Sequence, residues 1–163
     1  MKLTCFLLIV SVALISCKAK TAFEYSETIV RMESELSAEI SAADKKLNEY
    51  LQADKIDSVV YMSRHMESLA ENTLNEIGSM RAPNVPEGDS FKKAALAYFA
   101  YVKDIYTSFR KFSSARTEKE KDREAKKLAK IMDDRKARTL AMQAAQRKFA
   151  AANNFDLEKT ARN

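Results

Sequence analysis

Cysteine and histidine, the side chains most typical of transition-metal sites and nucleophilic catalysis, are scarce in this sequence: it has two cysteines, Cys5 and Cys17, and a single histidine, His65. Di-iron sites in helical bundles use a Glu-x-x-His motif, but Met62 stands three residues before His65. On a helix wheel His65 falls about 110° from the apolar face around Met66, so we expect it in solvent rather than on a metal or haem. Glycine-rich nucleotide-binding motifs and the Gly-x-Ser-x-Gly motif of serine hydrolases are also absent from the sequence. We therefore expect a protein that is not an enzyme and has no metal site.

Cys17 stands at the end of an apolar N-terminal segment. Residues 3–15 are mostly apolar, but the stretch is shorter than the roughly 20 residues needed to span a bilayer. Its length, and the small residue that follows it, are typical of a secretory signal peptide. The four residues LISC, 14–17, resemble the lipobox of bacterial lipoproteins, in which the cysteine becomes the new N-terminus. This resemblance implies that residues 1–16 are removed and that Cys17 is the lipidation site.

A lipidated Cys17 would decide where the rest of the chain works. Lipoproteins of this type carry three acyl chains, and two anchoring signals already give stable attachment. Residues 17–22 are then a short lipidated tether and residues 23–163 the folded domain. Because lysine rather than aspartate follows the cysteine, the resemblance favours the outer membrane and leaves the leaflet open. Removal of Cys5 leaves no second cysteine for a disulfide. Because the metal, haem and nucleotide motifs are also missing, we expect no cofactor besides the covalent lipid.

The composition predicts long helices. The 163 residues include only two glycines and two prolines, too few for the frequent turns of a β-sandwich or barrel. Apolar residues recur at steps of three and four, and residues 81–89, which hold both prolines, separate two halves. We predict an all-α, up-down-up-down antiparallel four-helix bundle, with an extended coiled-coil hairpin that dimerises as the alternative. The Thr117-x-x-Glu120 capping box opens the last helix, and Phe155 is expected to fold back onto the end of the bundle. The predicted helices cover about residues 23–53, 57–81, 90–114 and 118–152.

Two segments resemble a known class of proteins. They read PNVPEGDSFKKAALAYF, residues 83–99, and QRKFAAANNFDLE, residues 146–158. Proline and glycine before an aromatic-x-x-Ala-Ala-Leu helix, and a closing Asn-aromatic pair, are similar to small helical surface lipoproteins of Bacteroidota and Leptospira. The resemblance implies a helical lipoprotein, and that class supplies no activity to carry over.

Charge is distributed unevenly along the chain. Residues 21–82 carry 12 acidic and 6 basic side chains, whereas residues 83–163 carry 11 acidic and 19 basic ones. The asymmetry either helps the two halves dock or presents a basic side to a partner. We expect contact with the membrane through the lipid anchor, and with an envelope polyanion or another envelope protein. Nucleic acid is not an expected partner of an exported chain.

The third predicted helix carries two stripes of large side chains. The core stripe runs from Phe91 to Phe109, and the second lies about 100° round the helix. One interpretation is burial against a second neighbouring helix, with the lysine and arginine stems covering the stripe. The functional interpretation is a partner surface, because alternating basic and aromatic groups are typical of interface anchors. The candidate partner-binding residues are Lys92, Leu96, Phe99, Lys103, Tyr106 and Arg110.

Arg135 is the charged residue that the pattern places furthest inside. Its wheel position lies on the apolar stripe that includes Ile131 and Met142. An unpaired charge there would cost several kcal/mol, so a carboxylate must lie nearby or the side chain must reach solvent. We predict a structural Glu39–Arg135 ion pair, with Glu35 as the alternative partner.

These features predict a non-catalytic cell-envelope lipoprotein that acts as a membrane-tethered interaction or structural module through its basic and aromatic surface. The alternative is a periplasmic chaperone or carrier that binds apolar clients between its helices. A closed bundle without a cavity would count against a carrier. Methionines on an open concave face would favour a chaperone, although core filling is the simpler explanation for them.

Overall fold

The computed structural model describes the backbone of residues 3–157 and the side chains of residues 18–157. Within these residues the regular elements are helices and no strand is present, which confirms the all-α prediction. The side chains of the signal peptide and of Cys17 lie outside the described residues, so cleavage and lipidation stay predictions. Among the described residues, no helix has the length and apolar character needed to cross a membrane. The helices are α1 (Leu3–Gln52), α2 (Ile56–Ser79), α3 (Gly88–Ser113), α4 (Glu118–Asp133) and α5 (Arg135–Ala152).

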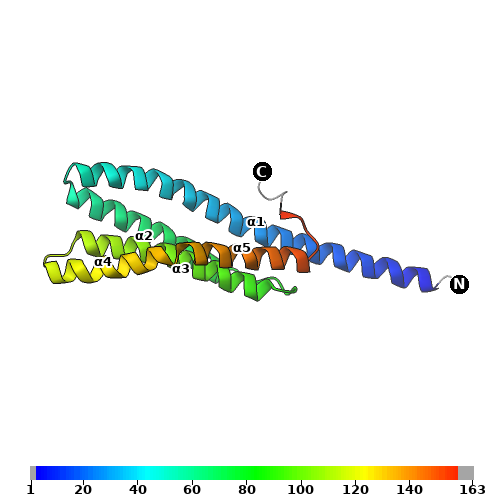
Figure 1. The fold of residues 1–163 in the computed structure, drawn as a ribbon. Coiled ribbons are helices and arrows are strands. Elements are labelled where there is room, and N and C mark those ends of the chain that lie inside the picture. The colour runs from blue at the N-terminus through cyan, green and yellow to red at the C-terminus, as the bar shows by residue number, and fades with distance from the viewer. Residues whose placement is uncertain (1–2, 158–163) are drawn as a thin grey trace.

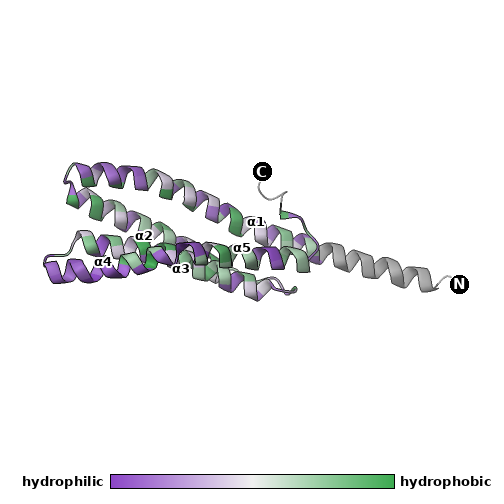
Figure 2. Cartoon of the chain, viewed as in Figure 1, coloured by the Kyte–Doolittle hydropathy of each residue, from purple (hydrophilic) through white to green (hydrophobic). Residues whose placement is uncertain are grey.

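The helices lie lengthwise beside one another, an arrangement compatible with a helical bundle (Figure 1). The turn between α1 and α2 and the turn between α3 and α4 lie at one end of the molecule. The loop between α2 and α3 lies at the other end, on the side of the N-terminus. α3 is the central helix, because it packs against α2 and also against α4 and α5. α4 is hydrophilic along most of its length and rests on α3 (Figure 2).

α1 continues without a break through residues 18–22, which were predicted to be part of a tether. Ala22 is fully buried, and Lys20 lies 3.8 Å from Glu24 one turn later. The segment contains no glycine or proline, and its lysines and alanines are good helix formers. The tether prediction is therefore wrong in form for these residues: α1 enters the bundle as one helix, without a flexible link.

An aromatic cluster closes the end of the bundle nearest the N-terminus. The rings of Phe91 on α3 and Phe149 on α5 stack with centroids 5.2 Å apart, and Tyr25 on α1 meets Phe149 edge-on at 6.2 Å. Phe155 packs on Phe149 at 5.7 Å and on Phe23 at 5.8 Å, so its predicted return to the end of the bundle is confirmed. The cluster fixes α1, α3 and α5 relative to one another.

The helix predicted over residues 118–152 is two helices separated by Asp134. Its start is as expected: the backbone N–H of Glu120 donates to Thr117 Oγ1 at 3.2 Å, and the backbone N–H of Thr117 donates to Glu120 Oε2 at 3.3 Å. The capping-box prediction is confirmed. Asp134 ends α4 and precedes α5 with ψ at −8°, well away from the usual helical value.

Candidate functional site

The basic members of the predicted stripe on α3 are turned toward α2. Lys92 donates to two backbone carbonyls at the C-terminal end of α2, at 2.8 and 2.5 Å. Lys103 Nζ donates to Glu71 Oε1 at 2.6 Å, and Arg110 Nε donates to Glu67 Oε2 at 2.6 Å. The hydrogen bond from Arg110 lowers the pKa of the Glu67 carboxyl. These contacts engage the cations within the protein rather than leaving them for a partner.

The apolar members of the stripe are buried. Phe99 is fully buried, Leu96 is partly buried, and Tyr106 retains only 4% of its exposure. The Tyr106 hydroxyl donates to Asp44 Oδ1 on α1 at 3.3 Å. The prediction of an exposed partner surface is therefore wrong, because α3 has helices packed on two sides and both of its stripes face neighbours.

The predicted Glu39–Arg135 ion pair is not formed among the described residues, and both side chains are exposed. Glu35, the alternative partner, pairs instead with Arg31 at 3.1 Å. Arg135 does lie on the side of α5 that faces α3 and the space between α1 and α5, as the wheel predicts. The pair fails because α1 packs mainly on α2 rather than on α5, and the Arg135 side chain reaches solvent instead.

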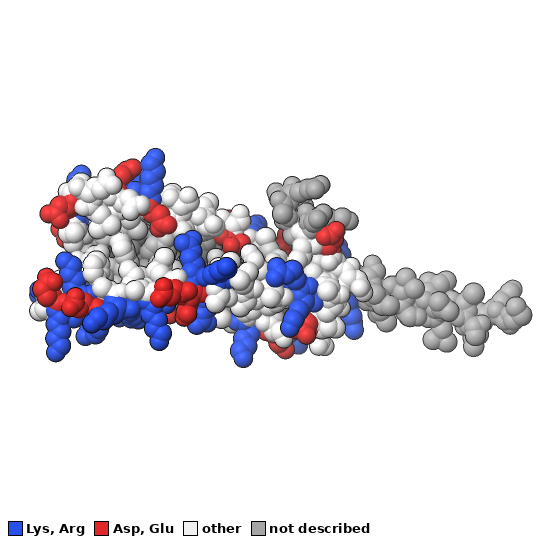
Figure 3. All heavy atoms as spheres, viewed as in Figure 1, with Lys and Arg blue, Asp and Glu red and all other residues white. Residues whose placement is uncertain are grey.

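A cleft lies between α1 and the α4–α5 pair, and α3 forms its floor. Figure 3 shows the surface hollowed between the upper helix α1 and the lower helix α4. One cavity in the cleft has a volume of about 350 Å³. A second, of about 210 Å³, shares Tyr98 and Thr139 with the first, so the two adjoin. The residues that line the first cavity are Ile40, Asp44, Tyr98, Tyr101, Val102, Ile105, Tyr106, Met132, Arg135 and Thr139.

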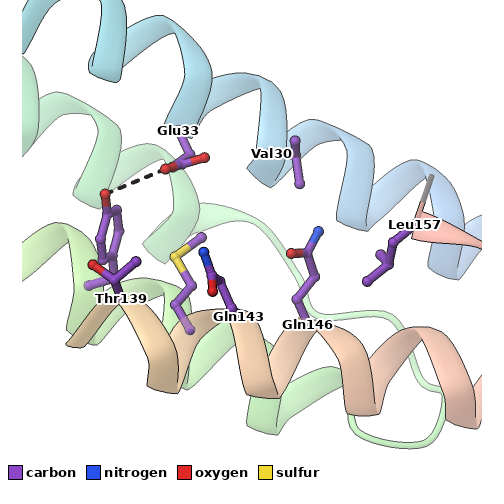
Figure 4. Close-up of a pocket in the computed structure, with 8 residues that line it drawn as sticks. Val30, Glu33, Thr139, Gln143, Gln146 and Leu157 are labelled. Carbon is purple, nitrogen blue, oxygen red and sulfur yellow. Dashed lines mark hydrogen bonds between the residues drawn. The ribbon is translucent and has the colours of Figure 1, made fainter. Parts of the chain in front are cut away.

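The second cavity extends the cleft along α1 and α5. Figure 4 shows Val30 and Glu33 on α1 opposite Gln143 and Gln146 on α5, with Leu157 at one end. A weak hydrogen bond of 3.5 Å from the Tyr98 hydroxyl to Glu33 crosses this space. The two cavities together make an elongated site rather than a round one.

Three tyrosines give the floor of the cleft its polar groups. Burial, with the nearby charge of Glu33, raises the pKa of Tyr98 to about 12. Burial also raises the pKa of Tyr106, and the charge of Asp44 adds to the effect. Tyr101 is 8% exposed, and within the described part of the chain its hydroxyl has no hydrogen-bond partner. Burial raises the pKa of Tyr101 too, so all three hydroxyls are protonated at neutral pH, and among the described residues only that of Tyr101 lacks a partner.

The cleft offers groups for binding rather than for bond making. Its walls combine apolar and aromatic side chains with one guanidinium and two carboxylates. Among the described residues, no group of three or more histidines, cysteines, aspartates or glutamates is placed to hold a metal. His65 is exposed on α2, as its position on the helix predicts. A hydrophobic site with a few convergent polar groups is the usual form of a small-molecule pocket.

Tyr101 belongs to neither of the two stripes predicted for α3. The segment YFAYVKDIY, residues 98–106, places three tyrosines within nine residues of a core helix. A buried tyrosine usually has a hydrogen-bond partner for its hydroxyl. Three tyrosines so close together on a core helix therefore indicated that part of this helix borders a space with polar groups.

Comparisons with protein-family models, with curated proteins and with solved structures found no match. The resemblance to small surface lipoproteins therefore stays a prediction.

Proposed function

We propose that this protein is a non-catalytic lipoprotein of the cell envelope that binds an apolar ligand in the cleft between α1 and the α4–α5 pair. The observation that carries the proposal is the cavity of about 350 Å³ with its floor of three tyrosines. The cavity opens to solvent between packed helices and combines apolar side chains with a few polar groups, which is the usual form of a small-molecule site in a helical bundle. It favours the carrier over a module that acts through the α3 stripe, since that stripe is buried.

The packing of the helices supports an up-down-up-down order with the cleft as its open side. α1 packs mainly on α2, and α4 mainly on α3. The closest packing of the bundle is between α2 and α3. The two outer helices, α1 and α4, then diverge at the end of the molecule away from the aromatic cluster. A ligand could enter there without unfolding the bundle.

The anchor and the cleft are connected by one helix in this proposal. A lipid on Cys17, in the outer membrane by preference, would leave α1 as the stalk of the protein. At about 1.5 Å per residue, Ile40 would lie roughly 35 Å along the helix from Cys17. The cleft would then stand clear of the headgroups while staying near the membrane, which suits a carrier of apolar molecules. An envelope polyanion, if one binds, would meet the lysines and arginines that gather along α4 (Figure 3).

Photolabelling with a neutral apolar probe tests the proposal. The whole protein is reconstituted in phosphatidylcholine vesicles and exposed to a diazirine derivative of dodecanol, and the labelled peptides are mapped by mass spectrometry. We expect the label on α3 near Ile105 and on α5 near Thr139. Ile105→Trp fills the cavity and should reduce the label, whereas Ser68→Trp, on an exposed position of α2, should not.

The thermal unfolding midpoints of both tryptophan variants show whether they remain folded. A folded Ile105→Trp variant that labels as strongly as the wild type would contradict binding in the cleft. Equal labelling over all exposed surfaces would contradict it as well.

A further inference from the structure

We infer that the ligand of the cleft is a single-chain amphiphile whose anionic head group binds the guanidinium of Arg135 and the hydroxyl of Tyr101. The inference rests on the proposed function of the cleft and assigns the chemical class of its ligand. Some polar groups of the cavity have hydrogen-bond or ion-pair partners within the protein and others have none, and this difference supports the inference.

The tyrosine hydroxyls of the cleft differ in whether they have a hydrogen-bond partner. Those of Tyr98 and Tyr106 donate to carboxylates on α1 at 3.5 and 3.3 Å. Tyr101 is more than nine-tenths buried and lines the same cavity, yet its hydroxyl has no partner in the described part of the chain. Buried polar groups are rarely left unpaired, and an unpaired one is costly. A ligand atom that accepts a hydrogen bond from Tyr101 would remove this cost.

The same cavity is bordered by a positive charge. Arg135 lines it, and no described residue forms an ion pair or hydrogen bond with its guanidinium. Arg135 is close enough to act on all three tyrosines, since its positive charge lowers the pKa of each against the effect of burial. A guanidinium binds carboxylate and phosphate oxygens through two parallel hydrogen bonds. Both donors line the same cavity, and an anionic group bound there would accept a hydrogen bond from each.

The two carboxylates that line the cavities lie on the wall opposite Arg135. Glu33 and Asp44 belong to α1, and each already accepts a hydrogen bond from a tyrosine. At the junction of α4 and α5, Asp134 lies close enough to Tyr101 to raise the pKa of its hydroxyl, but this carboxylate pairs with Arg138 at 4.0 Å. Arg135 forms no ion pair in the described part of the chain, so its charge is open to an anionic head group at this junction, away from α1.

The apolar part of the ligand follows from the shape of the site. Ile40, Val102, Ile105 and Met132 line the first cavity beside the head-group position. The adjoining cavity continues between α1 and α5 toward Val30 and Leu157. An elongated apolar space that ends at a cation is complementary to an alkyl chain with a terminal acid.

Three photoreactive probes with the same chain and different head groups test the inference: dodecanoate, dodecanol and dodecyltrimethylammonium. The whole protein in phosphatidylcholine vesicles is titrated with each, and half-saturation of cleft labelling is compared between the wild type and Arg135→Gln. The wild type and the variant are compared with the same probe each time, so differences between probes in how strongly they partition into the vesicles cancel. We expect Arg135→Gln to weaken dodecanoate about tenfold, as the loss of one charge-assisted contact implies, and to leave dodecanol unchanged.

Two further variants complete the design. Tyr101→Phe keeps the ring and removes the hydroxyl, and we expect it to weaken dodecanoate several-fold. Arg147→Gln makes the same change at an exposed position of α5 that lines neither cavity, and we expect no effect from it. If dodecanol labels the cleft but Arg135→Gln leaves dodecanoate unchanged, or if the cationic probe binds more tightly than dodecanoate, the inference is overturned and the proposed function stands. If no probe labels the cleft, both fall.

Discussion

Phe99 is fully buried on α3, and its aromatic ring contributes to the packing of the central helix. Phe99→Ala should lower the free energy of unfolding by about 3–5 kcal/mol, because it leaves a cavity in addition to the lost burial. Urea unfolding followed by circular dichroism measures the change. Tyr61→Ala is the matched control: Tyr61 is 73% exposed, and its removal should change stability by less than about 0.5 kcal/mol. A similar small effect for both would mean that Phe99 is not core.

The Glu67–Arg110 pair should make stability depend on acid pH. The folded pKa of Glu67 lies below its ordinary value of 4.5, chiefly because of the hydrogen bond from Arg110. The contribution of the pair is therefore complete above the unfolded pKa and is lost as the pH falls through the folded pKa. Glu67→Gln should reduce the free energy of unfolding by about 1–3 kcal/mol at neutral pH.

Unfolding free energies of the wild type and Glu67→Gln over a pH series check this expectation. The difference between them should shrink at pH values below 4.5, where the wild-type carboxylate becomes protonated. Glu76→Gln, at an exposed position of α2, should show no such gap at any pH. A gap between wild type and Glu67→Gln that persists undiminished in acid would contradict a charge-based role.

At this scale the sequence predicted periodic faces well and their neighbours poorly. The stripe through Phe99 and Tyr106 can be recognised on one helix from the sequence. Whether a neighbouring helix covers it depends on where α1 and α2 lie. Those positions come from long-range packing that no local pattern contains. Arg135 shows the same limit: its position on the inner side of the helix was predicted, but whether a carboxylate of α1 reaches it depends on where α1 lies.

The two glycines that flank the α2–α3 loop differ in whether a side chain can be added. There is no space for one at Gly88, whereas there is space at Gly78. A Cβ at Gly88, the first residue of α3, would lie 2.5 Å from the carbonyl oxygen of Pro83, whereas a Cβ at Gly78 would meet nothing within 4 Å. Gly88→Ala should therefore cost about 1–3 kcal/mol through a forced shift of the backbone. Gly78→Ala, near the end of α2, should gain about 0.5–1 kcal/mol because alanine is the better helix former.

Thermal and urea unfolding of the two glycine variants test this prediction. The free energy of unfolding should fall in Gly88→Ala and rise in Gly78→Ala. If Gly88→Ala were as stable as Gly78→Ala, the close approach of Pro83 to the start of α3 would be wrong.

The elements themselves were largely predictable. The capping box at Thr117 and the scarcity of glycine and proline fixed the helical class and one helix start. The continuity of α1 through residues 18–22 was missed, because a polar segment after an apolar one reads as a linker although every residue in it permits a helix.

For the whole molecule, the anchor is the prediction that decides its location. Because the residues before Cys17 resemble a lipobox, Cys17→Ala should abolish labelling by radioactive palmitate and leave the precursor at its full mass. Cys5→Ala, within the segment expected to be removed, should label and mature as the wild type does. Normal processing and labelling of Cys17→Ala would exclude lipidation at this residue.

The cleft could not have been predicted from the sequence, because it depends on how two pairs of helices diverge. Periodicity predicts that a helix has an apolar face, but a cavity forms where two such faces fail to meet. Here α4 rests on α3 and α1 on α2, so Tyr98, Tyr101 and Tyr106 line the space between the outer helices.

Fluorine NMR of the whole protein carrying fluorotyrosine tests ligand binding in the cleft most directly. The chain has six tyrosines and no tryptophan, and three of the six line the cavity while Tyr25, Tyr50 and Tyr61 do not. With dodecanoate added to the protein in lipid nanodiscs, the resonances of Tyr98, Tyr101 and Tyr106 should shift together and saturate, with the other three unchanged. Each resonance is assigned from the corresponding tyrosine-to-phenylalanine variant. Three stationary cleft resonances, or a shift confined to exposed Tyr61, would contradict a ligand site between α1 and the α4–α5 pair.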